Sequence, residues 1–127
     1  MYQKLPKINV IAQDIGRVLL NLINNAFYAV DKRAKENVDG YMPEVQVSTS
    51  QNDGKTEISV RDNGPGIPEE VQEKIFQPFF TTKPTGSGTG LGLSLSYDIV
   101  KAHGGELCVE SHVNIATVFV IKMPTTS

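Results

Sequence analysis

Residues 15–30 read IGRVLLNLINNAFYAV, and this stretch decides how the chain folds. Apolar side chains recur in it every three or four residues, at Leu19, Leu22, Ala26 and Val30. This spacing places them on one face of an α-helix, and that face must pack against another element. Asp14 stands directly before the pattern, where an aspartate can cap a helix, and the pattern fades near residues 37–40. We therefore expect a long helix between these points.

Strand patterns occur on both sides of this helix. Short apolar or alternating stretches of the kind that form strands occupy residues 7–12, 45–50, 56–60, 106–110 and 116–123. The turn sequence Asn52-Asp53-Gly54 lies between the second and third of them, which predicts a hairpin. The first stretch directly precedes the long helix, so we expect a strand there as well.

Two further helices complete the predicted fold. Pro68 opens a short one, since proline suits a first helical turn and the acidic Glu69 and Glu70 suit its positive end. After a loop at residues 79–90, a second long helix is indicated by Leu91, Leu95, Ile99 and Ala102 and ends at Gly104-Gly105. The elements predict an α+β two-layer sandwich, with about three helices on one face of a mixed, mostly antiparallel sheet of about five strands.

Composition limits the class of protein. The chain has 127 residues, which suits one domain, and its formal net charge of -2 supplies no basic field for nucleic acid. No apolar run reaches the roughly 20 residues that a membrane helix needs, and residues 1–6 lack the apolar core of a signal peptide, so we expect a cytoplasmic domain. Cys108 is a single cysteine without a disulfide or metal partner, and we assign it no role.

Three asparagines lie within the predicted long helix. Helical geometry places Asn21 and Asn25 side by side on its flank and turns Asn24 away. Amide oxygens in that position can bind a hard cation such as Mg²⁺ together with substrate phosphates. The simpler reading is that asparagines merely decorate a helix. Because asparagine is a poor helix former, three of them in five positions also indicate a functional site.

A rigid loop follows a predicted strand, with the sequence Asp62-Asn63-Gly64-Pro65-Gly66-Ile67-Pro68. It can be an ordinary turn, because Asp-Asn-Gly favours turns. Its two glycines, however, also allow a flat ligand to approach the backbone closely. The carboxylate at the end of the strand can accept a hydrogen bond from an exocyclic amine such as that of adenine.

A glycine-rich segment, Gly86-Ser87-Gly88-Thr89-Gly90-Leu91-Gly92, leads into the second long helix. It is either a flexible linker or a phosphate-binding loop, because backbone N–H groups and a helix N-terminus both favour anions. The spacing matches neither the dinucleotide fingerprint nor the P-loop, so a phosphate cradle of another type is indicated. Lys83, in the same stretch, can place a cation near the phosphates or can simply be a solvated lysine.

Taken together, these stretches resemble the N, G1, F and G2 boxes of the GHKL superfamily of ATP-binding domains. The matching segments are 21–26, 62–67, 75–80 and 88–93. The resemblance implies the Bergerat ATP fold, with ATP and Mg²⁺ as ligands. It also implies that the nucleotide is bound by Asn21, Asn25, Asp62, Gly64, Gly66, Ile67, Lys83, Gly88, Thr89, Gly90, Leu91, Gly92 and Thr117.

The resemblance gives these residues separate roles. Asp62 would bind the adenine amine, with Gly64 and Gly66 shaping the adenine wall and Thr117 nearby. Asn25 would bind Mg²⁺ and Asn21 would lie on the phosphate side, the two forming the catalytic pair. The glycines of the G2 box would let a lid over residues 81–90 close on the triphosphate. The turn at residues 113–115 lacks the glycines that are common in the family before the strand that carries the threonine.

One position indicates the branch of the superfamily. Hydrolysing ATPases and anti-sigma serine kinases carry a glutamate base one turn before the magnesium asparagine, and here that residue is Asn21. An amide cannot take a proton, so the resemblance narrows to sensor histidine kinases. The nucleophile would then be a histidine on a separate dimerisation and phosphoacceptor domain. We interpret His103 and His112 as structural, because neither has the expected helical context.

This interpretation predicts the partners as well. They are the phosphoacceptor domain of the same kinase and, indirectly, the receiver domain of a response regulator; no nucleic acid and no direct membrane contact are expected, and the isolated fragment should be a monomer. Two alternatives stay open. A GHKL ATPase or serine kinase would show turnover by the isolated chain despite Asn21. A degenerate nucleotide-binding regulatory module would bind ATP without transferring phosphate.

Overall fold

The computed structural model describes residues 5–52, 54–78 and 92–124, and within these ranges the side chains from Gln13 onward except that of Asn52. Three helices and four strands follow one another along this part of the chain: α1 (Leu5–Ala34), β1 (Val45–Asn52), β2 (Lys55–Asp62), α2 (Glu69–Gln72), α3 (Gly92–Ala102), β3 (Glu106–His112) and β4 (Ala116–Pro124). The strands form one sheet in the order β1-β2-β4-β3, and every pairing is antiparallel. The predicted α+β fold is therefore confirmed.

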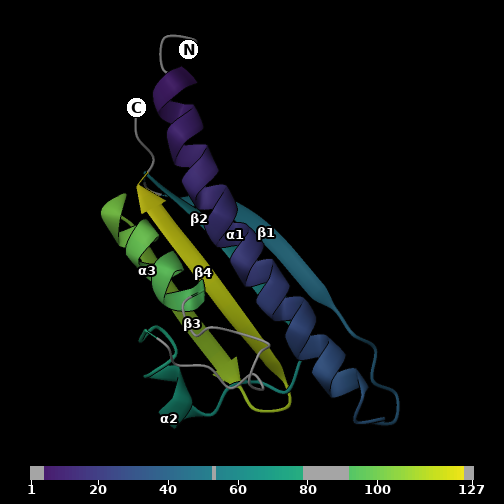
Figure 1. The fold of residues 1–127 in the computed structure, drawn as a ribbon. Coiled ribbons are helices and arrows are strands. Elements are labelled where there is room, and N and C mark those ends of the chain that lie inside the picture. Colours follow the sequence, from purple (N-terminus) through teal and green to yellow (C-terminus); the bar gives the residue numbers. More distant parts are fainter. Residues whose placement is uncertain (1–4, 53, 79–91, 125–127) are drawn as a thin grey trace.

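The elements form two layers (Figure 1). The long helices α1 and α3 lie over one face of the sheet, and the short helix α2 lies near the end of β3. In the described part of the chain, none of the helices has the length and apolar character needed to cross a membrane. The loop after β2 and the turn between β3 and β4 meet at the same end of the sheet, where Asn114 N donates to Pro65 O at 2.7 Å.

The core lies between the helices and the sheet. Its buried apolar side chains come from all the long elements except β1, and the largest fully buried ones are Leu22, Ile121, Val18, Val60 and Val100. On β4 the residues Phe119 and Ile121 alternate toward the helices, as expected for a strand covered on one face. Phe76 stacks on Tyr97 of α3 at 5.1 Å between ring centroids, so the segment after α2 is anchored to the same core.

The strand predicted at residues 7–12 is wrong, because α1 begins at Leu5 and runs through this stretch. The reason is visible in the sequence, where Ile8, Ile11 and Ile15 continue the apolar spacing of the helix toward the N-terminus. Asp14 therefore lies inside the helix and does not cap it. Its Oδ2 atom lies 2.9 Å from Nε2 of His103, just beyond the end of α3.

Other predicted elements are confirmed with adjusted details. The hairpin is present as β1 and β2, with Gly54 at a φ of 75° in its turn. The described sheet has four strands, one fewer than expected, and its pairings are not mixed. Helix α3 is also present, but Leu95, one of the residues that indicated it, is 52% exposed. The small Ser94 and Ser96 are buried instead, and Ser96 contacts Asn21 of α1.

Candidate functional site

The candidate site begins with a row of polar residues across the end of the sheet. Asp62, the last residue of β2, is 3% exposed and is paired in the sheet with Thr117 of β4. Thr117 is equally buried and is paired on its other side with Ser111 of β3. Three neighbouring strands therefore place a carboxyl and two hydroxyl groups side by side. The hairpin predicted for β1 and β2 accounts for the position of Asp62 at this edge.

Burial controls the chemistry of Asp62. It raises the pKa of the carboxyl, and this effect is partly opposed by the N–H of Gly64 and by the positive charge of Arg61. The Gly64 N–H donates to Oδ1 at 2.8 Å, so this oxygen is already engaged with the backbone. The second carboxyl oxygen is the acceptor that an exocyclic amine of a ligand can use.

Ser111 connects the polar row at the end of the sheet to the loop, although no motif in the sequence marks it. Its Oγ lies 2.6 Å from Oγ1 of Thr117 and 3.1 Å from the carbonyl oxygen of Ala116, and it accepts the N–H of Ile67 at 2.8 Å. A serine carries one hydroxyl proton. If that proton is donated to Ala116, Thr117 must donate to Ser111. The only signal in the sequence was the alternation of strand β3, which places Ser111 on the face of Leu107 and Val109.

The turn that precedes Thr117 adopts the needed shape without glycine. Asn114 has a φ of 61°, in the left-handed region that asparagine tolerates better than most residues. Its N–H donates to the carbonyl of Pro65, so the turn is joined to the loop after Asp62. Although the turn lacks the glycines that are common in the family, Thr117 is still paired with Asp62 in the sheet.

The two glycines of the loop are required by packing within the protein. A Cβ atom added to Gly64 would lie 2.8 Å from the Cβ of Ala29 on α1. One added to Gly66, whose φ is 80°, would lie 2.6 Å from the carbonyl oxygen of His112. The loop is thus held tightly between helix α1 and the β3–β4 turn, and this contact explains both glycines.

The asparagines of α1 lie as helical geometry predicts. Asn21 and Asn25 are half-buried, whereas Asn24 is exposed. Asn21 donates from Nδ2 to Oγ of Ser96 at 3.2 Å, and Ser96 is fully buried on α3. Asn25 precedes Ala29 by one helical turn, and Ala29 is the residue that packs against Gly64. The flank of α1 therefore extends from the loop after Asp62 toward the first turns of α3.

The predicted phosphate loop is described only at its last residue. Lys83, Gly88, Thr89, Gly90 and Leu91 lie outside the described residues. Gly92 is the first residue of α3, one helical turn before Ser96, and a Cβ atom there would meet no atom within 4 Å. The N-terminus of α3 thus lies on the Asn21 side of the candidate site, where its partial positive charge favours an anion.

A cation at this site would depend on amide and ligand oxygens. Within the described ranges, no group of three histidine, cysteine, aspartate or glutamate side chains is arranged to hold a metal ion. The half-buried amide of Asn25 fits Mg²⁺, because this ion binds oxygen ligands and commonly shares them with substrate phosphates. Asn21 presents its amide nitrogen to Ser96, so its oxygen lies on the other branch of the same amide group.

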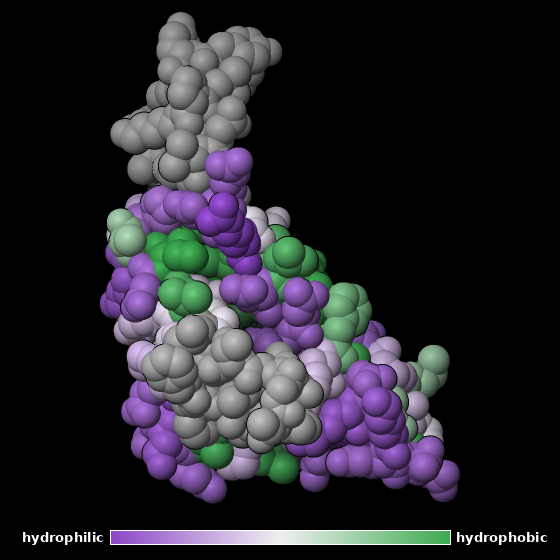
Figure 2. All heavy atoms as spheres, in the orientation of Figure 1, coloured by the Kyte–Doolittle hydropathy of each residue, from purple (hydrophilic) through white to green (hydrophobic). Residues whose placement is uncertain are grey.

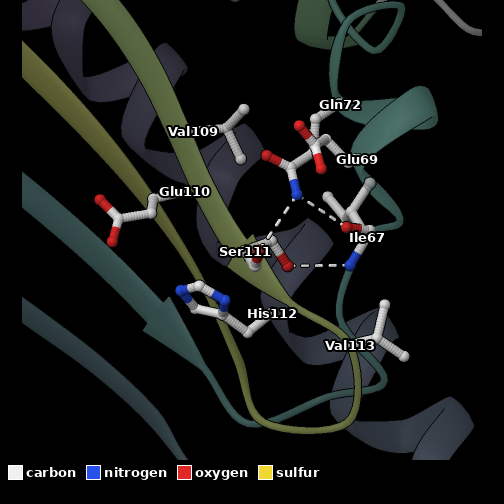
Figure 3. Close-up of a pocket in the computed structure, with 8 residues that line it drawn as sticks. All are labelled: Ile67, Glu69, Gln72, Val109, Glu110, Ser111, His112 and Val113. Atoms are coloured by element: carbon white, nitrogen blue, oxygen red, sulfur yellow. Dashed lines mark hydrogen bonds between the residues drawn. The ribbon is translucent and has the colours of Figure 1, made fainter.

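A hollow of about 430 Å³ lies beside the end of β3 (Figure 3). Gln72 of α2 crosses it and donates from Nε2 to the carbonyl oxygens of Ile67 and Ser111, at 2.8 and 3.1 Å. Glu110 and His112 extend from the opposite side of the strand. Among the predicted site residues that the structure describes, only Ile67 lines this hollow, where its carbonyl accepts from Gln72 of α2 and its N–H donates to Ser111 of β3.

Comparison with known proteins identifies the family to which this fold belongs. The family model described as histidine kinase-, DNA gyrase B- and HSP90-like ATPase matches residues 11–127. The signal transduction histidine-protein kinase AtoS of Escherichia coli (strain K12) is 40% identical over 122 residues, which are 95% of this chain and 18% of that protein. Sporulation kinase C of Bacillus subtilis (strain 168) is 35% identical over 94% of this chain and 26% of its own length.

Solved structures agree with these relatives. The catalytic domain of histidine kinase ThkA has a TM-score of 0.72 at 39% identity, covering 90% of this chain and 68% of that one. The mycobacterial sensor histidine kinase MprB has a TM-score of 0.71 at 30% identity, covering 89% of this chain and 71% of that one. The chain belongs to this family of ATPase domains and, within it, to the catalytic domains of sensor histidine kinases. It spans less than a third of AtoS and of sporulation kinase C.

Proposed function

We propose that this chain binds ATP with Mg²⁺ and presents the γ-phosphate to a histidine on a separate dimerisation and phosphoacceptor domain. The observation that supports this most directly is the buried Asp62, which engages the Gly64 N–H through one oxygen and lies in register with Thr117. Adenine carries an exocyclic amine that the second oxygen would accept. Because the surrounding residues are buried, a base without this amine would leave a polar group unpaired.

The flank of α1 would hold the phosphate end of the nucleotide. Asn25 would bind Mg²⁺ through its amide oxygen, and a bound Mg²⁺ neutralises charge that develops on the phosphate oxygens. Asn21, held by Ser96, would orient the phosphates. The segment with Lys83, Gly88, Thr89, Gly90 and Leu91, followed by Gly92, would close over the triphosphate, consistent with the N-terminus of α3 on this side.

The proposed reaction takes its nucleophile from another domain. An imidazole nitrogen of that domain would attack the γ-phosphorus in line; a nitrogen–phosphorus bond forms, the bond to the β–γ bridging oxygen breaks, and ADP leaves with the electron pair. The amide of Asn21 cannot take a proton from water, which supports transfer of the phosphate to histidine over hydrolysis of ATP. The phosphate would pass on to a receiver domain of a response regulator. We expect the chain to act in the cytoplasm and the isolated domain to be monomeric.

Calorimetric titration tests the binding part of the proposal. ATP should bind more tightly than GTP, and Mg²⁺ should strengthen ATP binding. Asn25→Ala should weaken ATP about tenfold with Mg²⁺ present and much less in a chelator, since it would remove a metal ligand. Asn24→Ala is the matched control. Asn24 is exposed on the same helix, so this variant should bind ATP with the affinity of the wild-type chain. Equal loss in chelator and in Mg²⁺ would remove the metal role from Asn25.

A second assay separates transfer from hydrolysis. The isolated chain should release little phosphate from ATP, and adding a phosphoacceptor domain should lead to a phosphorylated histidine on that domain. Rapid phosphate release by the chain alone would favour an ATPase. ATP binding without transfer to any phosphoacceptor domain would favour a regulatory nucleotide-binding module.

A further inference from the structure

A second group of polar side chains holds the loop that follows Asp62. Arg33, in the last turn of α1, donates from Nη1 to the carbonyl oxygens of Asn63 and Gly64, at 3.1 Å each. The Arg33 guanidinium lies over the ring of Tyr41, with 4.7 Å between Cζ and the ring centroid. The hydroxyl of Tyr41 donates to Oδ1 of Asn63 at 3.1 Å. We call Arg33, Tyr41 and Asn63 the loop clamp.

Asn63 extends the loop clamp to the segment between α1 and β1. Its Oδ1 accepts the N–H of Glu44 at 2.8 Å, and its Nδ2 donates to the carbonyl of Met42 at 2.7 Å. The backbone of Asn63 donates to the carbonyl of Glu44 as well, at 3.2 Å. Both branches of one amide side chain are therefore used to join the two loops. The position of Tyr41 relative to Arg33 follows from these bonds.

Gly64 transmits the effect of Arg33 to Asp62. Its N–H and the Asn63 carbonyl belong to one planar peptide group, in which the carbonyl accepts from Arg33 at 3.1 Å and the N–H donates to Oδ1 of Asp62 at 2.8 Å. Gly64 is buried against Ala29, so the peptide groups around it cannot easily exchange these partners for water. If the Gly64 peptide rotated, the hydrogen bond that sets the Asp62 carboxyl orientation would be lost.

Tyr41 has the protonation state that the loop clamp needs. Burial raises the pKa of the Tyr41 phenol, the positive charge of Arg33 opposes this increase, and the negative charge of Asp62 adds to it. The phenol therefore stays protonated at neutral pH and remains a donor to Asn63.

We propose that Arg33 is a positioning residue for recognition of the adenine base: it holds the peptide group between Asn63 and Gly64 and thereby orients the Asp62 carboxyl, while Tyr41 supports its guanidinium. This inference rests on the proposed function, because it requires adenine to bind at Asp62. A charge-assisted hydrogen bond to a backbone carbonyl is stronger than a neutral one, which makes an arginine suited to this role. Arg33 does not contact the nucleotide in this proposal; it acts through Gly64.

The test compares two nucleotides that differ where Asp62 would read the base. ATP carries an amino group at the six-position, whereas inosine triphosphate carries a carbonyl. We expect wild-type chain to prefer ATP, and Arg33→Met to reduce the ratio of the two dissociation constants about tenfold, mostly by weakening ATP. Lys32→Met is the matched control, since Lys32 is exposed on the same turn and its loss removes the same charge. Its ratio should equal that of wild type.

The outcomes separate the two proposals. A wild-type chain with no preference for ATP over inosine triphosphate would overturn adenine binding at Asp62, and with it this inference. A wild-type preference that Arg33→Met leaves intact, or equal weakening of both nucleotides, would overturn the positioning role alone, because a purely structural role lowers the folded fraction for both ligands. If Arg33→Met does not fold, the variants Arg33→Lys and Tyr41→Phe test the positioning role instead. Each should lower the ratio by a smaller factor, and unchanged ratios in both would refute the inference.

Discussion

At the scale of single residues, Asp62 combines two opposing influences. It is buried at the end of β2, which disfavours its charged form, while the Gly64 N–H and Arg61 favour that form. An ionised carboxylate that is partly removed from water in this way lowers the stability of the fold. It is also a strong hydrogen-bond acceptor for a ligand. Functional sites often retain such a conflict, because the ligand resolves it.

Asp62→Asn should make the unliganded chain more stable at neutral pH. Asparagine keeps an oxygen for the Gly64 N–H and removes the buried charge. Because the folded-state pKa of Asp62 is raised above its ordinary value of 3.8, the destabilisation is absent below that value and grows as pH rises through the folded pKa. Calorimetric melting from about pH 4 to about pH 8 should show a stability gain that increases with pH.

The matched control for this prediction is Asp98→Asn. Asp98 is exposed on α3, so its substitution removes a negative charge without relieving burial. Its melting temperature should follow wild type across the same pH range. A gain for Asp62→Asn that is independent of pH, or a loss at neutral pH, would show that the ionised carboxyl does not destabilise the fold.

At the scale of elements, polar contacts set the relative position of the two long helices. Asp14 of α1 meets His103 at the end of α3, and Asn21 of α1 meets Ser96 of α3. The members of these pairs are seven residues apart on each helix and run in opposite directions, so α1 and α3 are antiparallel. The same packing that closes the core therefore brings the Asn21 flank to the start of α3 (Figure 1).

The contact between the loop after β2 and the β3–β4 turn gives a prediction at this scale. Gly66→Ala combines a left-handed φ of 80° with a Cβ atom 2.6 Å from the His112 carbonyl oxygen, so both strain and collision should occur. The expected loss of unfolding free energy is about 2 to 5 kcal/mol. Urea denaturation measures it.

Gly40→Ala separates the effect of backbone strain from the effect of the collision. Gly40 has a similar φ of 73°, but a Cβ atom there meets nothing within 4 Å. This variant should lose only about 1 to 2 kcal/mol, from backbone strain alone. Equal losses in the two variants would mean that the turn at His112 shifts freely, and would contradict the tight contact between the turn and the loop.

At the scale of the whole molecule, one core holds the two layers together. Figure 2 shows hydrophilic residues over most of the visible described surface, with apolar residues gathered in limited areas. Leu22 of α1 and Ile121 of β4 are completely buried, and each belongs to the cluster that joins helices and sheet. Domains of this size are stabilised by only about 5–15 kcal/mol, so a single large cavity removes a substantial part of that.

Leu22→Ala should therefore lower the unfolding free energy by about 2 to 5 kcal/mol. Leu20→Ala is the matched control, since Leu20 lies on the same helix but is 58% exposed; its effect should stay within about 0.5 kcal/mol. Urea denaturation of both variants, with ATP absent, measures the difference. Similar effects at the two positions would contradict the placement of Leu22 in the core.

The sequence by itself determined the elements whose patterns are local. The apolar spacing of α1 predicted its buried face and the separation of Asn21 and Asn25 from Asn24, and the turn at residues 52–54 predicted the hairpin that ends at Asp62. Local patterns failed where two of them compete. Residues 7–12 suit a strand taken alone, yet they continue the helical spacing and are part of α1.

Only the tertiary structure decided the contacts between distant segments. The pairing of Asp62 with Thr117 depends on sheet order, and the support of Gly64 by Arg33 and Tyr41 depends on where the end of α1 meets the loop. The buried Ser96 of α3 meets Asn21 of α1, a contact that no apolar pattern could indicate. Periodicity reports which face of an element is buried, whereas the partner of a side chain is set by the packing of elements that are far apart in the chain.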